Sequence, residues 1–300
     1  MKFLIFTTDC PPIKDLPTSG TALRTFGIAQ GLIANGHEIV LSPPKTAMAK
    51  IKFDSPTVKE LKENSFDSNN QRALIEKHQP DVILCGHWPA LSLSSKPSQP
   101  IIIDLAGPHM LERHYQKSPN QQGALLSKLN NLGLADYFIV SGSKQRFYFL
   151  SYLLRAGIEN PEQKIVNIPM ALSPEMSPKQ ESEKELEKFN SPKFVFAGVF
   201  LPWQDPSAGL EQLVEEIDSR DTGSLKLIGG KHPNYQIKEK RYEKLFSKIS
   251  KSKNVIQKPL MPYDKFINEL SDCNVALDLM AWNLEREPVS YTHLTLPTKA

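Results

Sequence analysis

Two loops in the first half of the sequence carry residue types that bind anions or handle hydroxyl groups. The first, DCPPIKDLPTSGTALR, enters a predicted helix at Gly20, where backbone N–H groups and the positive end of the helix dipole can face an anion. Arg24 lies one turn further along and could reach the same group. The alternative is a Ser-Gly helix cap and a surface arginine, because the dinucleotide spacing G-x-G-x-x-G is absent.

The second loop is DLAGPHMLERH, in which Asp104 ends a strand that we expect to be central in a sheet. His109 follows directly after a Gly-Pro turn. A strand-end carboxylate beside an imidazole suits hydroxyl binding or general base catalysis. The alternative is that Asp104 caps the next helix and His109 is exposed. After the preceding strand, His87 offers a further histidine and Trp88 an apolar or sugar-stacking wall. The histidine spacing matches no zinc pattern, so we predict no metal.

The second half of the sequence places glycines at the ends of predicted strands. Gly198 in FAGVFLPWQDP marks a close backbone approach or a sharp turn. In LKLIGGKHP, a turn at Gly229 and Gly230 followed by Lys231 is expected to grip a diphosphate. A plain turn with a solvated lysine is the alternative. Backbone groups around Tyr263 in PLMPYDKF could hold the edge of a base.

The elements that must position these loops alternate regularly between apolar strand runs and helical patterns. KFLIFTT and PIIIDLAG read as strands buried on both faces, and amphipathic helices such as SGTALRTFGIAQGLIANG separate them. This alternation predicts an α/β protein with two doubly wound, Rossmann-like lobes. We place the first lobe at residues 1–173, a polar linker at 174–192, and the second lobe, which we expect to be incomplete, at 193–288.

Composition narrows the classes of function. The net charge of +3 is small and the basic residues are scattered, so we expect no nucleic acid partner. No apolar run approaches the length of a transmembrane segment, which leaves room only for peripheral membrane contact. The start MKFLIF is too short for a signal peptide, and three scattered cysteines form no C-x-x-C, so we expect buried thiols and a cytoplasmic protein.

The last residues, 289–300, do not continue the β-α pattern. Codons GTC TCT TAT ACA CAT CTG ACG CTG CCG ACG encode the residues from Val289 to Thr298, and this string resembles the transposase mosaic-end adaptor used in sequencing libraries. We therefore expect this tail to be non-native, in a sequence of metagenomic type, and the chain to be a C-terminally truncated fragment that is inactive by itself. The alternative is a natural threonine-rich edge strand.

Taken together, these motifs resemble glycosyltransferases of the GT-B fold, in particular the large family numbered 4. The resemblance rests on SGTALR, on DLAGPH, and on the order F-x-G, L-x-G-G and MPYDKFINELSDCNVAL in the second half. It departs from the family after the first strand of the second lobe, where Trp203, Gln204 and Asp205 replace the usual arginine and lysine. The family's paired glutamates would lie beyond the end of the second lobe. The motif D-x-D of the other glycosyltransferase fold is absent from the sequence.

The resemblance implies a hexosyltransferase-type enzyme. It would move a sugar from a nucleotide-diphosphate-sugar donor to an acceptor hydroxyl on a glycan, a lipid-linked molecule or a small molecule, with no permanently bound cofactor. Gly20 and Arg24 would bind the leaving diphosphate, Asp104 or His109 would handle the acceptor hydroxyl, and Lys231 would stabilise the leaving group. The alternatives are a non-catalytic two-lobed binding protein and an NAD(P)-dependent oxidoreductase, although the loop after KFLIF has too few glycines for the latter.

Overall fold

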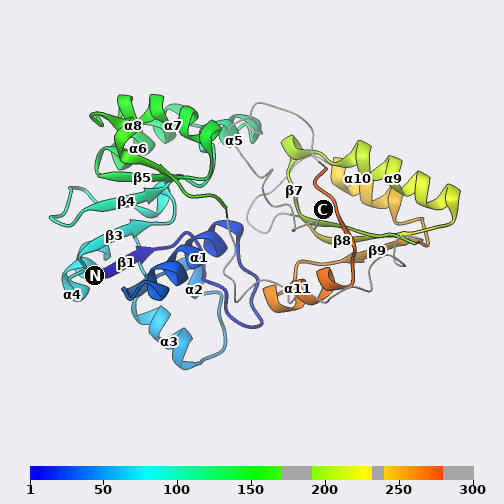
Figure 1. The fold of residues 1–300 in the computed structure, drawn as a ribbon, viewed down its shortest axis with the longest axis horizontal. Helices are drawn as coiled ribbons and strands as arrows, with labels where there is room; N and C mark the ends of the chain where they lie inside the picture. Colours follow the sequence, from blue (N-terminus) through cyan, green and yellow to red (C-terminus); the bar gives the residue numbers. More distant parts are fainter. Residues whose placement is uncertain (171–190, 232–239, 280–300) are drawn as a thin grey trace. The chain divides into compact units, whose positions relative to one another are not determined.

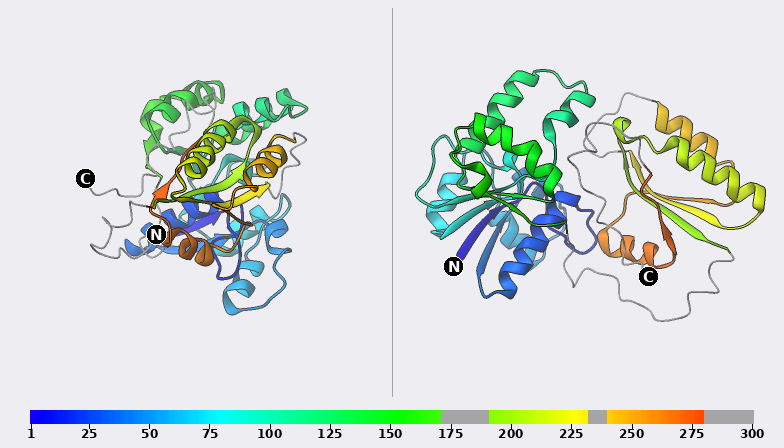
Figure 2. Two further views of the ribbon diagram at one scale, coloured as in Figure 1. Left: turned by 90° about the vertical axis from the view of Figure 1, so that its right-hand side faces the viewer. Right: turned by 45° about the horizontal axis from the view of Figure 1, so that its top comes forward.

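The structure is a computed structural model that describes residues 1–170, 191–231 and 240–279. This part of the chain forms two compact units, one of residues 1–13 and 18–170 and the other of residues 14–17, 191–231 and 240–279. Each unit is a parallel sheet with helices between its strands, as Figures 1 and 2 show. The predicted α/β fold with two Rossmann-like lobes is confirmed. The tail at 289–300 and residues 174–190 of the predicted linker lie outside the described residues.

The first unit is a six-stranded parallel sheet in the order β2-β1-β3-β4-β5-β6. Its strands are β1 (Lys2–Phe6), β2 (Glu38–Ser42), β3 (Val82–Cys85), β4 (Ile101–Asp104), β5 (Tyr137–Val140) and β6 (Ile165–Asn167). Its helices are α1 (Gly20–Ala34), α2 (Lys45–Met48), α3 (Pro56–Glu63), α4 (Gln71–His78), the 3₁₀ turn η1 (Trp88–Ala90), α5 (His109–Tyr115), α6 (Gln121–Gly133), α7 (Ser143–Arg155) and α8 (Pro161–Lys164). β4 lies in the interior of this sheet, as the sequence predicted for the strand that Asp104 ends.

Successive residues of β1 are buried on opposite faces of the first sheet. Leu4 and Phe6 pack into the core under α4, α6 and α7, while Phe3 and Ile5 pack into the core under α1. Because the side chains of a strand alternate with period two, a run that is apolar at every position must be covered on both sides. The run KFLIF therefore indicates a sheet with helices on both of its faces.

The second unit is a four-stranded parallel sheet in the order β10-β7-β8-β9. Its elements are β7 (Lys193–Phe200), the 3₁₀ turn η4 (Pro202–Gln204), α9 (Ser207–Arg220), β8 (Ser224–Lys231), α10 (Arg241–Ile249), β9 (Val255–Lys258), α11 (Tyr263–Ser271) and β10 (Val275–Ala276). In Figures 1 and 2, α9 and α10 lie side by side on one face of the sheet and α11 lies on the other. β10 is short because only Val275 and Ala276 pair with β7.

Candidate functional site

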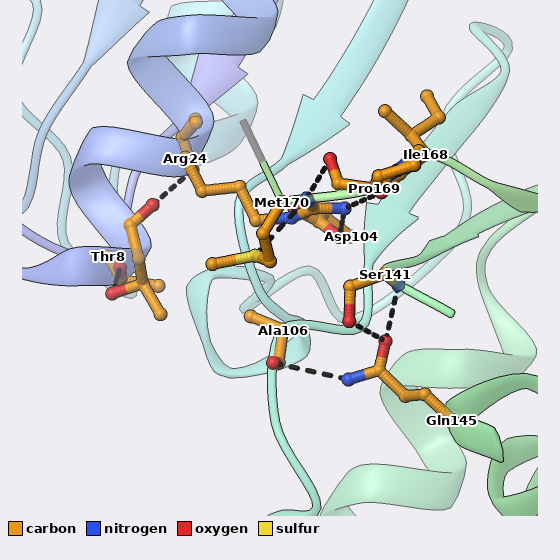
Figure 3. A network of polar contacts seen from close by, with 11 residues as sticks. Thr8, Arg24, Asp104, Ala106, Ser141, Gln145, Ile168, Pro169 and Met170 are labelled. Atoms are coloured by element: carbon orange, nitrogen blue, oxygen red, sulfur yellow. Dashed lines mark hydrogen bonds and ion pairs between the residues drawn. The ribbon is translucent and has the colours of Figure 1, made fainter. Parts of the chain in front are cut away.

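Two of the predicted site residues form a buried ion pair at the carboxyl end of β4. The guanidinium of Arg24 donates to both carboxylate oxygens of Asp104, from Nε at 2.5 Å and from Nη2 at 3.2 Å. The side chains are 3% and 0% exposed. Figure 3 shows Arg24 reaching from α1 across the end of the sheet to Asp104. Burial raises the pKa of Asp104, and the charge and hydrogen bonds of Arg24 oppose that rise.

The other donors of Arg24 bind the chain that follows β6. Nη2 donates to the carbonyl of Ile168 at 3.0 Å, and Nη1 donates to the carbonyl of Pro169 at 3.2 Å and to Sδ of Met170 at 3.3 Å. An arginine side chain has five N–H donors, and these contacts together with those to Asp104 engage all of them. Arg24 is therefore not a surface arginine. Its geometry favours a role in fixing the end of β6 against α1 and β4.

The same burial bears on the role expected for Asp104. A carboxylate that is fully buried and holds a guanidinium through both oxygens has little freedom to take a proton from an incoming hydroxyl. The geometry favours a positioning role for Asp104. It does not cap the following helix either, because the residue before α5 is Pro108.

The loop that leads into α1 is held by hydroxyl groups. Oγ of Ser19 accepts the N–H of Ala22 at 3.3 Å, so the predicted Ser-Gly cap is present. Thr21 accepts a hydrogen bond from Thr8 at 2.9 Å, which ties the first turn of α1 to the end of β1. A Cβ at Gly20 would meet open space, so nothing in the packing requires glycine there. An anion-binding role for Gly20 remains a prediction.

Polar side chains also fix the end of β5. Oε1 of Gln145 accepts the N–H of Ser141 at 2.6 Å and its hydroxyl at 3.1 Å, while Nε2 donates to the carbonyl of Ala106 at 3.3 Å (Figure 3). Gln145 is 0% exposed and comes from the first turn of α7. It therefore joins the loop after β4 to the loop after β5. The sequence analysis missed this residue, because its position in the helix gives no sign that its side chain is buried.

His109 is half-buried at the start of α5, and its ring lies edge-to-face on Trp88 with the ring centres 4.9 Å apart. Burial, followed by the charges of Lys128 and Arg113, lowers the pKa of His109 to about 4. At neutral pH the imidazole is therefore uncharged and able to accept a proton. Trp88 is 5% exposed and packs in the hydrophobic core, so of the two walls expected from the sequence the structure favours the apolar one.

Lys128 is a fully buried charged residue that was not predicted from the sequence. The residue is 0% exposed, and its ammonium lies 4.0 Å from the ring centre of Tyr152 and 4.6 Å from that of Phe149. Burial lowers the pKa of Lys128 to about 7, whereas the charge of Glu112 raises it. A signal was present, because Lys128 lies one helical turn before Leu132 on the buried stripe of α6.

Lys128 should make the stability of the first unit depend on pH. Because its pKa falls from 10.5 to about 7 on folding, the unfolded chain holds more protons between these values, and stability rises with pH across this window. Between pH 7 and pH 9 we expect the free energy of unfolding of the wild type to rise by about 2 kcal/mol because of Lys128, and Lys128→Met should remove this rise. Urea unfolding at pH 7 and pH 9 measures it, with Lys59→Met on the surface of α3 as control. Equal pH slopes for wild type and Lys128→Met would contradict the assignment.

Gly198, Gly229 and Gly230 of the second unit lie within paired strands. Gly198 of β7 pairs with Gly229 of β8, and Val199 pairs with Gly230, so the turn predicted at Gly229–Gly230 is wrong. All three glycines have positive φ, 148° at Gly198, 122° at Gly229 and 118° at Gly230. A Cβ on Gly229 would overlap the carbonyl oxygen of Gly198. The strands can stay paired through this stretch because neither residue of the pair has a side chain.

The remaining predicted residues of the second unit are only partly described. Lys231 is the last residue of β8, and its side chain lies outside what the structure describes. Tyr263 is the first residue of α11, is half-buried, and has a pKa that burial raises. In the described residues, no group of histidine, cysteine and acidic side chains could hold a metal ion. No described helix is long and apolar enough to cross a membrane.

Comparisons with known proteins find the fold but no near relative. No family model matches the chain, and no curated protein matches its sequence. Among solved structures, sucrose-phosphate synthase from Thermosynechococcus elongatus is similar with a TM-score of 0.63 and 16% identity, covering 97% of this chain and 77% of that one. Anabaena HepE in complex with UDP and glucose is similar with a TM-score of 0.58 and 14% identity, covering 97% of this chain and 77% of that one.

A third similar structure has a different activity in its name. It is a putative UDP-N-acetylglucosamine 2-epimerase from Listeria monocytogenes, with a TM-score of 0.51 and 14% identity, covering 92% of this chain and 73% of that one. At such identities the likeness establishes the fold alone. The architecture of the chain is therefore one that sugar transferases and a sugar epimerase share.

Proposed function

Since the chain has the GT-B fold of two Rossmann-like lobes, we propose that it belongs to a glycosyltransferase. The enzyme transfers a sugar from a nucleotide-diphosphate-sugar donor to an acceptor hydroxyl and is of the hexosyltransferase type. The observation that carries the proposal is the likeness over 97% of the chain to HepE, which was solved with UDP and glucose. The donor is a substrate, and no cofactor stays bound.

Two glycines near the strand ends of the second sheet support the assignment of the donor to the second unit. Ligands of open parallel sheets bind beyond the carboxyl ends of the strands. Gly198 and Gly230 lie near the ends of β7 and β8, where backbone without side chains lets a phosphate approach closely. Lys231 follows at the end of β8 and stabilises charge on the departing diphosphate. Backbone groups beside Tyr263 hold the base.

The first unit then binds the acceptor. In the transfer, the acceptor oxygen bonds to the anomeric carbon of the sugar while the bond from that carbon to the diphosphate breaks, and the acceptor proton passes to a base. His109 is the better candidate for this base, because its imidazole is uncharged at neutral pH and Asp104 is held by Arg24. Arg24 and Asp104 position the end of β6, and Gly20 binds an anionic group through the backbone N–H groups at the start of α1.

An epimerase acting on a nucleotide sugar is the second candidate, because a protein named for that activity shares the fold. The reactions differ in their products. A transferase releases the nucleoside diphosphate, an epimerase returns an isomeric nucleotide sugar, and a binding protein does neither. Incubating the chain with UDP-glucose and resolving the nucleotides by chromatography separates a transferase from an epimerase. Because we expect this fragment to be inactive by itself, the absence of both products does not identify a binding protein.

A binding experiment tests the donor site without turnover. We expect the chain to bind UDP more tightly than UMP, because the second phosphate contacts the glycine stretch and Lys231. Lys231→Met should weaken UDP binding about tenfold, or about 1.4 kcal/mol. Lys251→Met, an exposed lysine of the same unit, is the matched control and should bind UDP as wild type does. Isothermal titration calorimetry that shows equal affinity for UDP and UMP would contradict the proposed role of this stretch.

A further inference from the structure

A group of buried side-chain nitrogens in the first unit has no hydrogen-bond partner in the described part of the chain. We call it the nitrogen cluster, and its members are Nδ1 of His87, Nε1 of Trp88, Nδ1 of His109, Nε of Arg113 and Nζ of Lys128. Buried polar atoms are nearly always paired, and a group left unpaired costs about 1–3 kcal/mol. Several in one place therefore require an explanation.

The members come from separate elements that meet beyond the ends of β3 and β4. The Trp88 ring lies edge-to-face on His109 at 4.9 Å and on His87 at 6.1 Å. The charge of Lys128 acts on both histidines, and that of Arg113 acts on His109. The backbone of Asp104 acts to raise the pKa of His87, which places the cluster beside the end of β4.

The cluster has a surplus of donors and positive charge. The N–H groups of Trp88, Arg113 and Lys128 can only donate, and these residues have no acceptor nitrogen. The aromatic faces around Lys128 attract its charge but leave its three N–H groups without an oxygen or nitrogen acceptor. Burial and then the charge of Lys128 lower the pKa of His87 to about 3, so His87 is neutral at pH 7. Glu112 is the acid whose charge favours the ammonium of Lys128.

We propose that the nitrogen cluster binds an anionic group, a carboxylate or a phosphate monoester, of a small molecule. Its oxygens accept hydrogen bonds from Trp88, Arg113 and Lys128, and its charge offsets the positive field in a site of low dielectric. His87 and His109 are half-buried residues, although Nδ1 of each ring is buried. The site shares His109 with the proposed transfer reaction, but anion binding at the cluster can be measured without sugar transfer.

Two probes test the proposal on the whole chain, inorganic phosphate and acetate. We expect one of them to bind with saturation and a dissociation constant on the order of 1 mM. Calorimetry and NMR of the lysine side chains measure this binding. Binding should also raise the pKa of Lys128 and protect the first unit against unfolding. Phosphate and acetate as separate arms show which anion the site prefers.

Variants connect the binding to the cluster. Lys128→Met should weaken binding at least tenfold, while Lys59→Met, which removes an exposed lysine of the same unit, should leave it unchanged. Trp88→Phe keeps the aromatic packing but loses the N–H, so it serves if Lys128→Met does not fold, and it should weaken binding several-fold. The proposal is overturned if neither probe saturates at tenfold higher concentration, or if Trp88→Phe and Lys128→Met bind as wild type does. It is likewise overturned if ordered water alone joins the nitrogens in a crystal soaked with both probes.

Discussion

Replacing Arg24 by methionine is expected to destabilise the first unit by about 3–5 kcal/mol, because the change leaves the carboxylate of Asp104 buried without its cation. The carbonyls of Ile168 and Pro169 also lose their donor, so the segment after β6 should loosen. Urea unfolding measures the loss. Hydrogen exchange at the amides of β4 and β6 shows whether the loss is confined to the first unit.

Two control variants show whether the loss of stability comes from breaking the buried ion pair between Arg24 and Asp104. Arg24→Met combined with Asp104→Leu removes both charges and should recover much of the stability, because an apolar pair of similar volume replaces a buried ion pair at little cost. Lys2→Met breaks the exposed pair with Glu38, whose side chains are 29% and 64% exposed, and should cost less than about 1 kcal/mol. If Arg24→Met costs no more than Lys2→Met, the pair does not hold the end of β6.

The fold was predictable because each element carries its own signal. The apolar run of β1 and the helical stripe of α1 lie within short windows of sequence, and the end of α1 is marked by Gly36, which adopts φ 79°. The rule that strands joined by helices form parallel sheets then supplies the architecture. A short segment of sequence could not show that β10 pairs over only two residues, because the length of the pairing depends on the distant strand β7.

The candidate site was predictable only in part, because its contacts join residues that are far apart in the sequence. Sequence reasoning placed Arg24 and Asp104 in strand-end loops, yet 80 residues separate them, and nothing local shows that they bind each other. It treated the donors of Arg24 as open to a ligand, whereas the segment from Ile168 to Met170 occupies three of them. Lys128 was overlooked for a different reason: its place on the buried stripe of α6 is a local signal, but a lysine in a helix is ordinarily solvated.

The glycine pair of the second unit shows how a residue can be required by packing and suit a ligand as well. Gly198 and Gly229 face each other across β7 and β8, which pair without interruption from Lys193 and Ser224 to Phe200 and Lys231. The sequence indicated a close backbone approach at Gly198, and the structure has it, against another strand. Contact with a phosphate at the same glycines belongs to the proposed function.

Gly229→Ala is expected to cost more than about 3 kcal/mol and to unfold the second unit in part. Its Cβ would overlap the carbonyl oxygen of Gly198, a backbone atom that cannot move without breaking the ladder between β7 and β8. Its φ of 122° adds strain for any residue with a side chain, about 1–3 kcal/mol. Urea unfolding gives the total loss, and hydrogen exchange at the amides of β7 and β8 locates it.

Gly198→Ala is the matched control, because this residue has a similar positive φ of 148° but a Cβ there would meet open space. It should therefore show the cost of backbone strain without the overlap, about 1–3 kcal/mol. The difference between the two variants measures the close approach of the strands. If Gly229→Ala is as stable as Gly198→Ala, then the need for a positive φ alone explains why these positions are glycine. The close approach of the strands would then not be the reason, and the lack of side chains there would serve only the proposed binding of the donor phosphates.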